Sequence, residues 1–222
     1  MQMARACAVD ATPRLRQAFA MSHAMPHAAI LILAAGQSSR MRGADKMLES
    51  VEGQPLIRRQ SQVALATGLP VWVTLPPDRP WRLAALQNLP LTVIKVADAD
   101  QGLSRSIKAG NAAVPAGLSL ILWLADLPEI TKDDLLQLAR AAQAAPDAII
   151  RATTAAGKPG HPVVFASKFR AKLNTLAGDD GARDILRQHM SETIFVPLPG
   201  NRALTDLDTP EDWANWRASQ ML

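Results

Sequence analysis

Short, continuously apolar runs alternate with amphipathic segments along most of this chain, and this alternation restricts the folds available to it. The apolar runs are AILIL (29–33), VWVTL (71–75), LTVIKV (91–96), LSLILWL (118–124) and AIIRA (148–152). Continuous apolarity is typical of strands that are buried on both faces of a parallel sheet. Helix-like patterns separate the runs, at 55–68, 79–88, 103–114 and 131–145. This order predicts an α/β fold with right-handed crossover connections.

The pattern changes after residue 152. A turn and another strand are predicted over 155–165, a pair of helices over 167–190, and a further strand over 193–199. Thr209, Pro210 and Asp212 then predict the capped start of a last helix. We therefore expect a single domain over residues 28–222, in which the C-terminal third supplies a cap or one wall of a site.

The first 27 residues differ in composition from the rest of the chain. They are rich in Ala, Met and Arg, and Asp10 is their only acidic residue. This composition resembles that of a transit peptide, but a disordered extension, or an upstream start codon with Met21 or Met25 as the true start, explains it more simply. We expect this extension to lie outside the fold.

Charge and aromatic content restrict the classes of partner. The 24 basic and 20 acidic side chains leave a net charge of +4, which suits a small anionic ligand, and no long basic stripe indicates nucleic acid. Aromatic residues make up only 4% and Tyr is absent, which argues against bases stacking on a sheet. No apolar run approaches the roughly 20 residues that cross a bilayer. Because Cys7 is the only cysteine, no internal disulfide is possible, and a cytoplasmic location is expected.

The stretch LAAGQSSRMRGADK (33–46) follows the first predicted strand and suits an anion. Small side chains let a ligand approach the backbone, hydroxyl and N–H groups can surround an anion, and basic side chains supply charge. The residues concerned are Leu33, Ala34, Ala35, Gly36, Ser38, Arg40 and Lys46. The stretch fits neither the Walker A pattern nor G-x-G-x-x-G. The alternative is a long solvated turn with scattered basic residues.

Asp126 follows the strongly apolar strand predicted at 118–124, and Pro128 comes just after it. A carboxylate at the tip of a buried strand needs a partner, because its desolvation is costly. A divalent cation such as Mg²⁺, which takes one or two protein carboxylates, is one such partner. A cap on the following loop, or an ion pair with a nearby Arg, is the other explanation.

Asp206 and Asp208 alternate within LTDLDTPED (204–212), so an extended backbone would point both to one side. Either is a candidate second carboxylate for the same metal. The alternative is that Asp208 simply belongs to the turn before the capped helix.

Two weaker signals are Ser104 and His161. Ser104 lies in QGLSRSIKAG (101–110), where a turn at a helix N-terminus would favour anions. His161 stands between Gly160 and Pro162, a setting in which His more often orients its loop than exchanges a proton. We assign no acid–base role to His161.

Together these motifs resemble those of the MobA-like NTP transferase family, the nucleotidyltransferases that act on molybdopterin. They occur in the family's order, cover residues 29 to about 216, and are LAAGQSSRMRGADK, QGLSRSI, LADLPEI, GHPVVF, LAGDDGARDIL and DLDTPEDW. LAAG in place of LAGG resembles the molybdenum cofactor cytidylyltransferase branch. That branch joins CTP to the molybdenum-bearing pterin phosphate with Mg²⁺, giving the cytosine dinucleotide cofactor and pyrophosphate. The implied fold is a three-layer, Rossmann-like domain of the GT-A type.

The resemblance also implies roles for individual residues. It implies that Arg40, Lys46 and Asp126 are catalytic. It also implies that Asp126 and Asp208 bind Mg²⁺. The nucleotide would contact the residues of the anion loop named above, together with Ser104. The pterin acceptor would contact Gly160, His161, Pro162, Asp179 and Arg183. A molybdoenzyme or its chaperone is the implied recipient of the product.

Two departures from the family pattern lie in these motifs. Arg42 stands between Met41 and Gly43, where the family runs straight from Met to Gly, so the reach of Lys46 to a phosphate comes into question. Leu127 replaces the more usual Met after Asp126, a milder change.

The residues leave other functions open. One is a transferase of the same fold that uses GTP or another phosphate acceptor, such as a sugar phosphate. A second is a chaperone that binds a nucleotide or cofactor without catalysis, against which Arg40, Lys46 and Asp126 argue. A third is a GT-A glycosyltransferase, which carries a DxD motif at a strand end. Residues 98–100 and 206–208 match DxD, but the expected strand tip at Asp126 does not.

Overall fold

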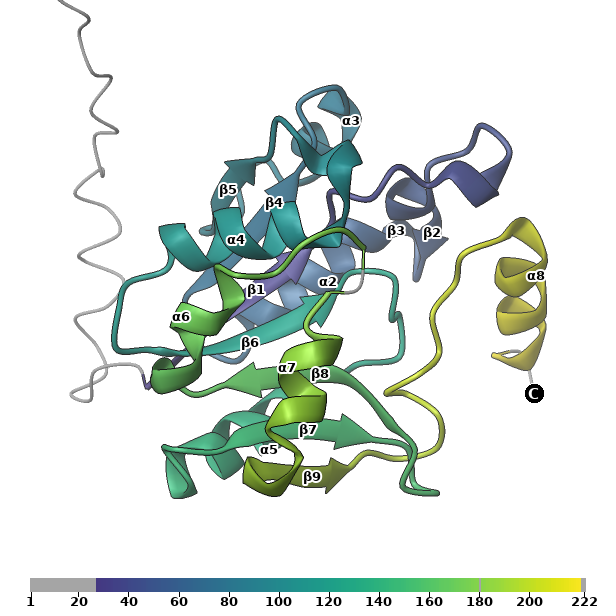
Figure 1. Cartoon of the computed structure of the whole chain (residues 1–222). Coiled ribbons are helices and arrows are strands. Elements are labelled where there is room, and N and C mark those ends of the chain that lie inside the picture. The colour runs from purple at the N-terminus through teal and green to yellow at the C-terminus, as the bar shows by residue number, and fades with distance from the viewer. Residues whose placement is uncertain (1–26, 180, 221–222) are drawn as a thin grey trace, which may run out of the picture.

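The computed structural model describes residues 27–179 and 181–220. The predicted N-terminal extension lies outside these residues, apart from His27. A seven-stranded sheet runs through the domain in the order β5-β4-β1-β6-β8-β7-β9 (Figure 1). Its strands are β1 (Ala28–Leu33), β4 (Val71–Leu75), β5 (Thr92–Lys95), β6 (Ser119–Leu124), β7 (Ile149–Thr153), β8 (Pro159–Phe165) and β9 (Thr193–Pro197). Only β8 runs antiparallel to its neighbours, so the predicted α/β fold with a mostly parallel sheet is confirmed.

Helices cover both faces of the sheet and complete a three-layer arrangement (Figure 1). One face carries α4 (Leu103–Ala113), α6 (Arg170–Leu173) and α7 (Arg183–Gln188). The other carries α2 (Leu56–Leu65) and α5 (Lys132–Ala144), and α3 (Pro80–Ala85) and α8 (Pro210–Ser219) lie at the periphery.

The central strand β1 explains why its sequence is apolar at every position. Ile30 and Ile32 pack into one core, whereas Leu31 and Leu33 pack into the other. Each such side chain contributes roughly 1.5–3 kcal/mol when it is fully buried. A polar residue at any of these positions would therefore weaken one of the two layers.

The strands β1 and β6 end side by side, and this places two of the predicted motifs together. Leu33 and Leu124, the last residues of the two strands, are register partners. The N–H of Ala125 donates to the carbonyl of Leu33 at 3.2 Å. The anion loop and Asp126 consequently leave the same edge of the sheet, where ligands of open α/β sheets bind.

Two local predictions need correction, and one element was not predicted. The helix expected over 79–88 is limited to α3, and the pair expected over 167–190 is reduced to a 3₁₀ turn and the short helices α6 and α7. Gly178 and Gly181 interrupt the second of these, because both adopt positive φ, at 59° and 56°. A small hairpin of β2 (Ser50–Val51) and β3 (Gln54–Pro55) was missed. Its turn residues Glu52 and Gly53 both have positive φ, a conformation that Glu seldom signals.

The predicted starts of the last two long helices are confirmed. Thr131 caps α5 and Thr209 caps α8, each in a capping box with the Asp three residues later. Pro210 occupies the first turn of α8, as expected. In the part of the chain that the structure describes, no helix combines the length and apolarity needed to cross a membrane.

Candidate active site

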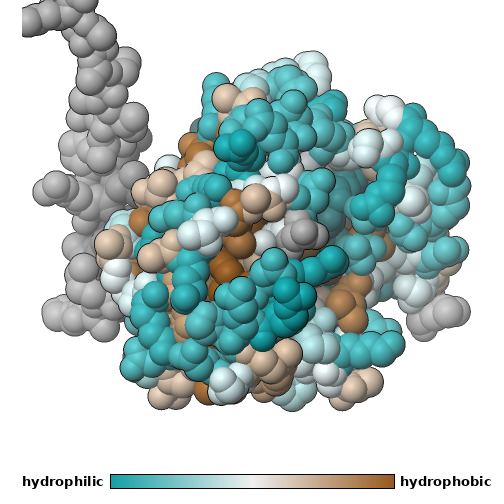
Figure 2. Space-filling view, in the orientation of Figure 1, coloured by the Kyte–Doolittle hydropathy of each residue, from teal (hydrophilic) through white to brown (hydrophobic). Residues whose placement is uncertain are grey.

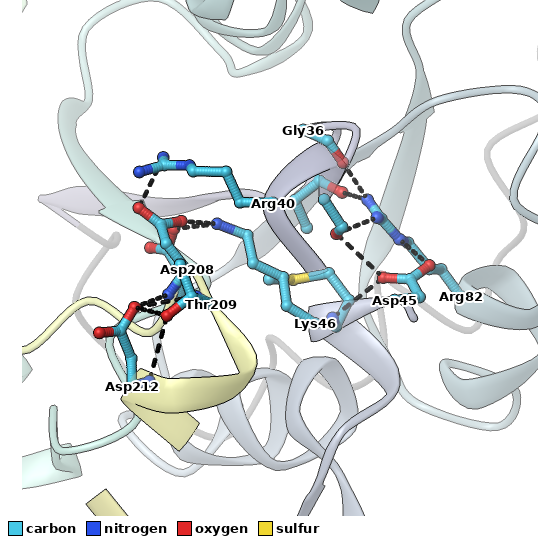
Figure 3. Close-up of polar contacts among 12 residues, drawn as sticks. Gly36, Arg40, Asp45, Lys46, Arg82, Asp208, Thr209 and Asp212 are labelled. Atoms are coloured by element: carbon cyan, nitrogen blue, oxygen red, sulfur yellow. Dashed lines mark hydrogen bonds and ion pairs between the residues drawn. The ribbon is translucent and has the colours of Figure 1, made fainter. Parts of the chain in front are cut away.

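Lys46 joins two carboxylates that come from distant parts of the sequence (Figure 3). Its Nζ lies 2.5 Å from Oδ2 of Asp126 and 2.7 Å from Oδ1 of Asp208. The three side chains retain only 13%, 16% and 14% of their exposure. Burial alone would lower the pKa of Lys46, but the charges and hydrogen bonds of the two carboxylates raise it above its ordinary value. The ammonium group is therefore charged at neutral pH.

Asp208, rather than Asp206, faces Lys46, and the backbone around it explains this choice. The N–H of Leu207 donates to the carbonyl of Asp126 at 3.2 Å, which draws the segment alongside the tip of β6. The N–H of Asp208 donates to the Asp212 carboxylate at 3.2 Å, so the cap of α8 also orients this residue. Asp206 is exposed and takes no part in the Lys46 contacts.

Arg40 adds a second cation to the pair. Its Nη2 lies 2.6 Å from Oδ2 of Asp208, and 68% of its side chain is exposed. Figure 3 shows Arg40 and Lys46 reaching the same carboxylate from the anion loop. Because Arg40 is open to solvent, it can turn toward an incoming anion without unfolding its surroundings.

The acid pair suits a divalent cation. Oδ1 of Asp126 is buried without a hydrogen-bond partner, although buried carboxylate oxygens are normally paired. Within the described residues, no group of three or more His, Cys, Asp or Glu forms a closed metal cage. Mg²⁺ is usually bound by one or two carboxylates together with water and substrate phosphates. Asp126 and Asp208 therefore fit such an ion, provided that a nucleotide supplies further oxygens.

The anion loop is held from beneath by Arg82 on α3, a residue that the sequence reasoning missed. Its side chain is fully buried and donates to the carbonyls of Ala34 and Gly36, at 2.6 and 2.8 Å. It also bonds the Ser38 hydroxyl at 3.1 Å and the Asp45 carboxylate at 2.8 Å. The available signal was an Arg inside the otherwise apolar stretch 80–86.

Arg82 also affects which backbone groups of the loop stay available. With the carbonyls of Ala34 and Gly36 directed to Arg82, the N–H groups of Gly36 and Gln37 donate no hydrogen bond within the described part of the chain. Free N–H groups in a loop after a strand can bind an anion. The geometry is thus compatible with the predicted phosphate contact at Gly36.

The extra Arg42 does not displace Lys46. Arg42 adopts φ 52° and pairs with Glu211 on α8 at 2.7 Å, with both side chains exposed. The inserted residue is accommodated by this bend at the surface, and Lys46 still reaches the strand tip. The reach of Lys46 to a phosphate stays a prediction.

A cavity of about 350 Å³ lies next to the acid pair. Of the residues predicted on the acceptor side, Gly160, His161, Asp179 and Arg183 line it, as does Leu33 from the anion loop. Pro162 is buried in β8 and does not line the cavity. Arg151 and Asp206 also line it, and neither was predicted there.

Gly160 shapes the wall of this cavity. A Cβ at this position would collide with the carbonyl oxygen of Ala203, so only glycine lets the segment leading to Asp208 approach β8. The N–H of His161 donates to the same carbonyl at 2.9 Å. The close approach joins the acceptor side to the metal side of the site.

His161 and Asp206 have perturbed titration in this cavity. Burial, followed by the charge of Arg151, lowers the pKa of His161 to about 4, so its imidazole is neutral at pH 7. Its Nδ1 is buried without a partner. Although the Asp206 side chain stays largely exposed, the protein packed around its cavity side raises its pKa, and the carboxylates of Asp208 and Asp126 add to this effect.

Ser104 lies at the N-terminus of α4, beneath the loop that carries Asp179. Its side chain is buried, and its N–H donates to the carbonyl of Gly178 at 3.1 Å. The Asp179 carboxylate accepts from the N–H of Leu103 at 3.3 Å. The loop therefore covers the end of α4 where a nucleotide would approach Ser104. The predicted contact between Ser104 and the nucleotide stays a prediction.

The fold and the site together define an enzyme that transfers nucleotidyl groups: an anion loop after the first strand, a strand-tip carboxylate and an adjoining cavity. Residues 30–193 match the MobA-like NTP transferase domain. The chain belongs to this family of nucleotidyltransferases.

Known proteins agree with this placement. A probable molybdenum cofactor guanylyltransferase from Nostoc sp. strain PCC 7120 is 29% identical over 189 residues, which cover 83% of this chain and 87% of that protein. The homologue of Rv0371c from Mycobacterium sp. strain JC1 superposes with a TM-score of 0.76 at 26% identity, covering 87% of this chain and 96% of that one. Rv0371c of Mycobacterium tuberculosis H37Rv, in complex with manganese, shares the fold at 22% identity and a TM-score of 0.73, covering 87% of this chain and 99% of that one.

Proposed function

We propose that this enzyme transfers a cytidylyl group from CTP to the phosphate of a molybdopterin-type acceptor. The observation that carries the proposal is the contact of Lys46 with both Asp126 and Asp208, at the junction of the anion loop and the cavity. One side of this junction suits a triphosphate, and the other can enclose an organic acceptor. The family's nucleotidyl transfer chemistry requires both.

The reaction needs no general base. An oxygen of the acceptor phosphate attacks the α-phosphorus of the nucleotide, and a new P–O bond forms there. The bond from the α-phosphorus to the oxygen bridging to the β-phosphorus breaks, and its electron pair leaves with pyrophosphate. The acceptor phosphate is already anionic, so positioning and charge neutralisation are the main contributions of the protein. His161 is in any case a weak base at pH 7, because its pKa is lowered to about 4.

Arg40 and Lys46 are suited to the charge that grows on the leaving pyrophosphate. Arg40 is exposed and offers a planar fork, whereas Lys46 is a compact, buried charge. Asp126 and Asp208 would hold Mg²⁺, which when bound supplies a Lewis acid for the phosphate oxygens. The manganese complex of Rv0371c, a protein of the same fold, supports a divalent ion here.

GTP is the alternative nucleotide. Relatives named as guanylyltransferases favour GTP. The loop sequence favours CTP, because this chain has LAAG, with Ala35, where the guanosine branch of the family has LAGG. A methyl group at position 35 leaves less room beside the loop than glycine does, which suits a smaller base. A molybdoenzyme or its chaperone as recipient of the product belongs to the same proposal.

Pyrophosphate release with each of CTP, GTP, ATP and UTP, with and without molybdenum-bearing molybdopterin, tests the proposal. We expect release with CTP that depends on the acceptor and on Mg²⁺, and loss of this release in a folded Asp126→Ala variant. If only GTP gives pyrophosphate, the enzyme is a guanylyltransferase and not a cytidylyltransferase. If the protein binds CTP but none of the four nucleotides gives pyrophosphate, it is a binding protein and not an enzyme.

A further inference from the structure

Arg151 is a partly buried cation that lines the cavity and has no role in the proposed reaction as described above. It lies on β7, and its Nε donates to the carbonyl of Gly160 at 3.2 Å. Arg183, the first residue of α7, lines the same cavity. Among the described residues, neither Arg has a carboxylate within ion-pair distance, although twelve other such pairs form.

The two arginines line the same cavity, where no charge of opposite sign pairs with either of them among the described residues. Burial lowers the pKa of Arg151, and the charge of Arg183 lowers it further. Taking a cation out of water beside a like charge costs free energy, and proteins retain such an arrangement where an anion offsets it. The arrangement is therefore better suited to binding than to stability.

We propose that Arg151, together with Arg183, binds the phosphate of the acceptor in this cavity. This inference rests on the proposed function and specifies which residue of the acceptor side recognises the nucleophile. Arg151 has its Nε fixed by Gly160, so its terminal N–H groups remain for an anion. A planar guanidinium matches two oxygens of a phosphate, which an ammonium group does not.

The position of Arg151 relative to the acid pair agrees with this role. The strand β8 lies between them, because its Val163 is the register partner of Arg151 on β7 and of Leu122 on β6, four residues before Asp126. Leu124 and Leu127, which flank Asp126, line the same cavity. An anion at Arg151 would thus lie on the side of the cavity that adjoins the nucleotide.

The rest of the cavity suits an organic ring. Leu122, Val163 and Phe165 supply apolar lining from the strands β6 and β8. In the space-filling view, apolar surface lies in the middle of this face between hydrophilic side chains (Figure 2). A flat heterocycle that carries a phosphate ester combines the two features, whereas free phosphate would use only the Arg pair.

Fluorescence titration with neopterin monophosphate tests the inference, with neopterin as the probe that lacks the phosphate. We expect Arg151→Gln to weaken binding of neopterin monophosphate by about tenfold or more. Its affinity for neopterin and for CTP should change by less than about threefold, and Arg151→Lys should recover part of the loss. Arg140→Gln, on the exposed surface of α5, is the matched control and should behave as wild type.

Two results would overturn the inference. One is wild-type protein that binds neopterin and its monophosphate equally well. The other is an Arg151→Gln variant that loses affinity for both probes alike, or for neither, with unchanged circular dichroism and melting temperature.

These titrations need no turnover, so they test the phosphate site separately from the proposed function. If no nucleotide gives pyrophosphate but binding still depends on Arg151, the proposed function fails and the phosphate site stands. If transfer occurs and Arg151→Gln leaves the KM for the acceptor unchanged, the proposed function stands and the phosphate site at Arg151 fails.

Discussion

The ammonium group of Lys46 lies 2.5 Å from the carboxylate of Asp126, a residue 80 positions further along the chain. The same group also lies 2.7 Å from Asp208, at a separation of 162 positions. Lys46 cannot neutralise both carboxylates and a triphosphate at the same time. We therefore expect nucleotide and divalent cation to bind together, with Lys46 moving to the phosphates as the cation takes over the two acids.

Replacement of Lys46 tests this exchange. Lys46→Met removes the cation between Asp126 and Asp208, so Mn²⁺ should bind more tightly in the absence of nucleotide. Affinity for CTP should fall by about tenfold or more, since a charge-assisted bond to phosphate is lost. Mn²⁺ titration followed by electron paramagnetic resonance measures the first effect and calorimetric titration with CTP measures the second, each with Arg42→Met as a control from the same loop. Unchanged Mn²⁺ affinity would contradict the exchange.

The two acidic residues before α8 should differ in their effect on metal binding. Asp208→Asn removes a carboxylate that shares Lys46 with Asp126, so affinity for Mn²⁺ in the presence of CTP should fall by about tenfold or more. Asp206→Asn, two residues earlier and exposed, should leave it within about threefold of wild type. The same resonance titration compares the pair, and equal losses would show that both residues are ligands.

Arg82 is expected to support both stability and nucleotide affinity. Arg82→Met leaves the carbonyls of Ala34 and Gly36 and Oδ2 of Asp45 without their donor, and breaking such a buried ion pair costs about 3–5 kcal/mol. Urea unfolding measures the loss, and the KM for CTP should rise because the loop loses its anchor. In Arg58→Met, whose Nη1 bonds only the carbonyls of Ala85 and Gln87, the KM should stay near the wild-type value.

The sequence predicted the strands and the strand-tip acid well, because both depend on local patterns. A continuous apolar run such as 71–75 matches β4 to the residue, and Asp126 follows β6 as expected. The contact of Lys46 with Asp208 could not be predicted, since it depends on how the segment 204–208 docks on the tip of β6. The residue pattern left Asp206 and Asp208 equivalent and only the family resemblance favoured Asp208; the hydrogen bonds from Leu207 to Asp126 and from Asp208 to Asp212 distinguish them in the structure.

Buried arginines were the main omission for the same physical reason. Arg82 and Arg151 lie inside segments whose apolar pattern predicts helix or strand, and the pattern says nothing of their partners. Their roles depend on carbonyls and charges supplied by other elements, namely the anion loop for Arg82 and α7 for Arg151. Such partners become visible only once the sheet order is known.

His161 should make stability depend on pH in a defined window. Its pKa is lowered from 6.5 to about 4 in the folded protein, so between these values the unfolded chain binds more protons. Stability should therefore fall as the pH drops from about 6.5 to about 4, by up to about 3 kcal/mol from this residue. Urea unfolding at pH 7 and pH 4.5 should show a smaller difference for His161→Gln than for wild type. Identical differences would mean that His161 titrates normally.

Ala35 offers the sharpest test of nucleotide choice. Its side chain is buried in the anion loop next to Gly36, and its methyl group is what separates LAAG from LAGG. Removing the methyl gives more room beside the loop, so Ala35→Gly should shift the ratio of kcat/KM for CTP over GTP toward GTP by about tenfold, the scale of one methylene in a binding pocket. Ala34→Gly, its neighbour and equally buried, is the matched control for added backbone freedom. A shift of the same size in both variants would show that flexibility, and not the space at position 35, determines the preference.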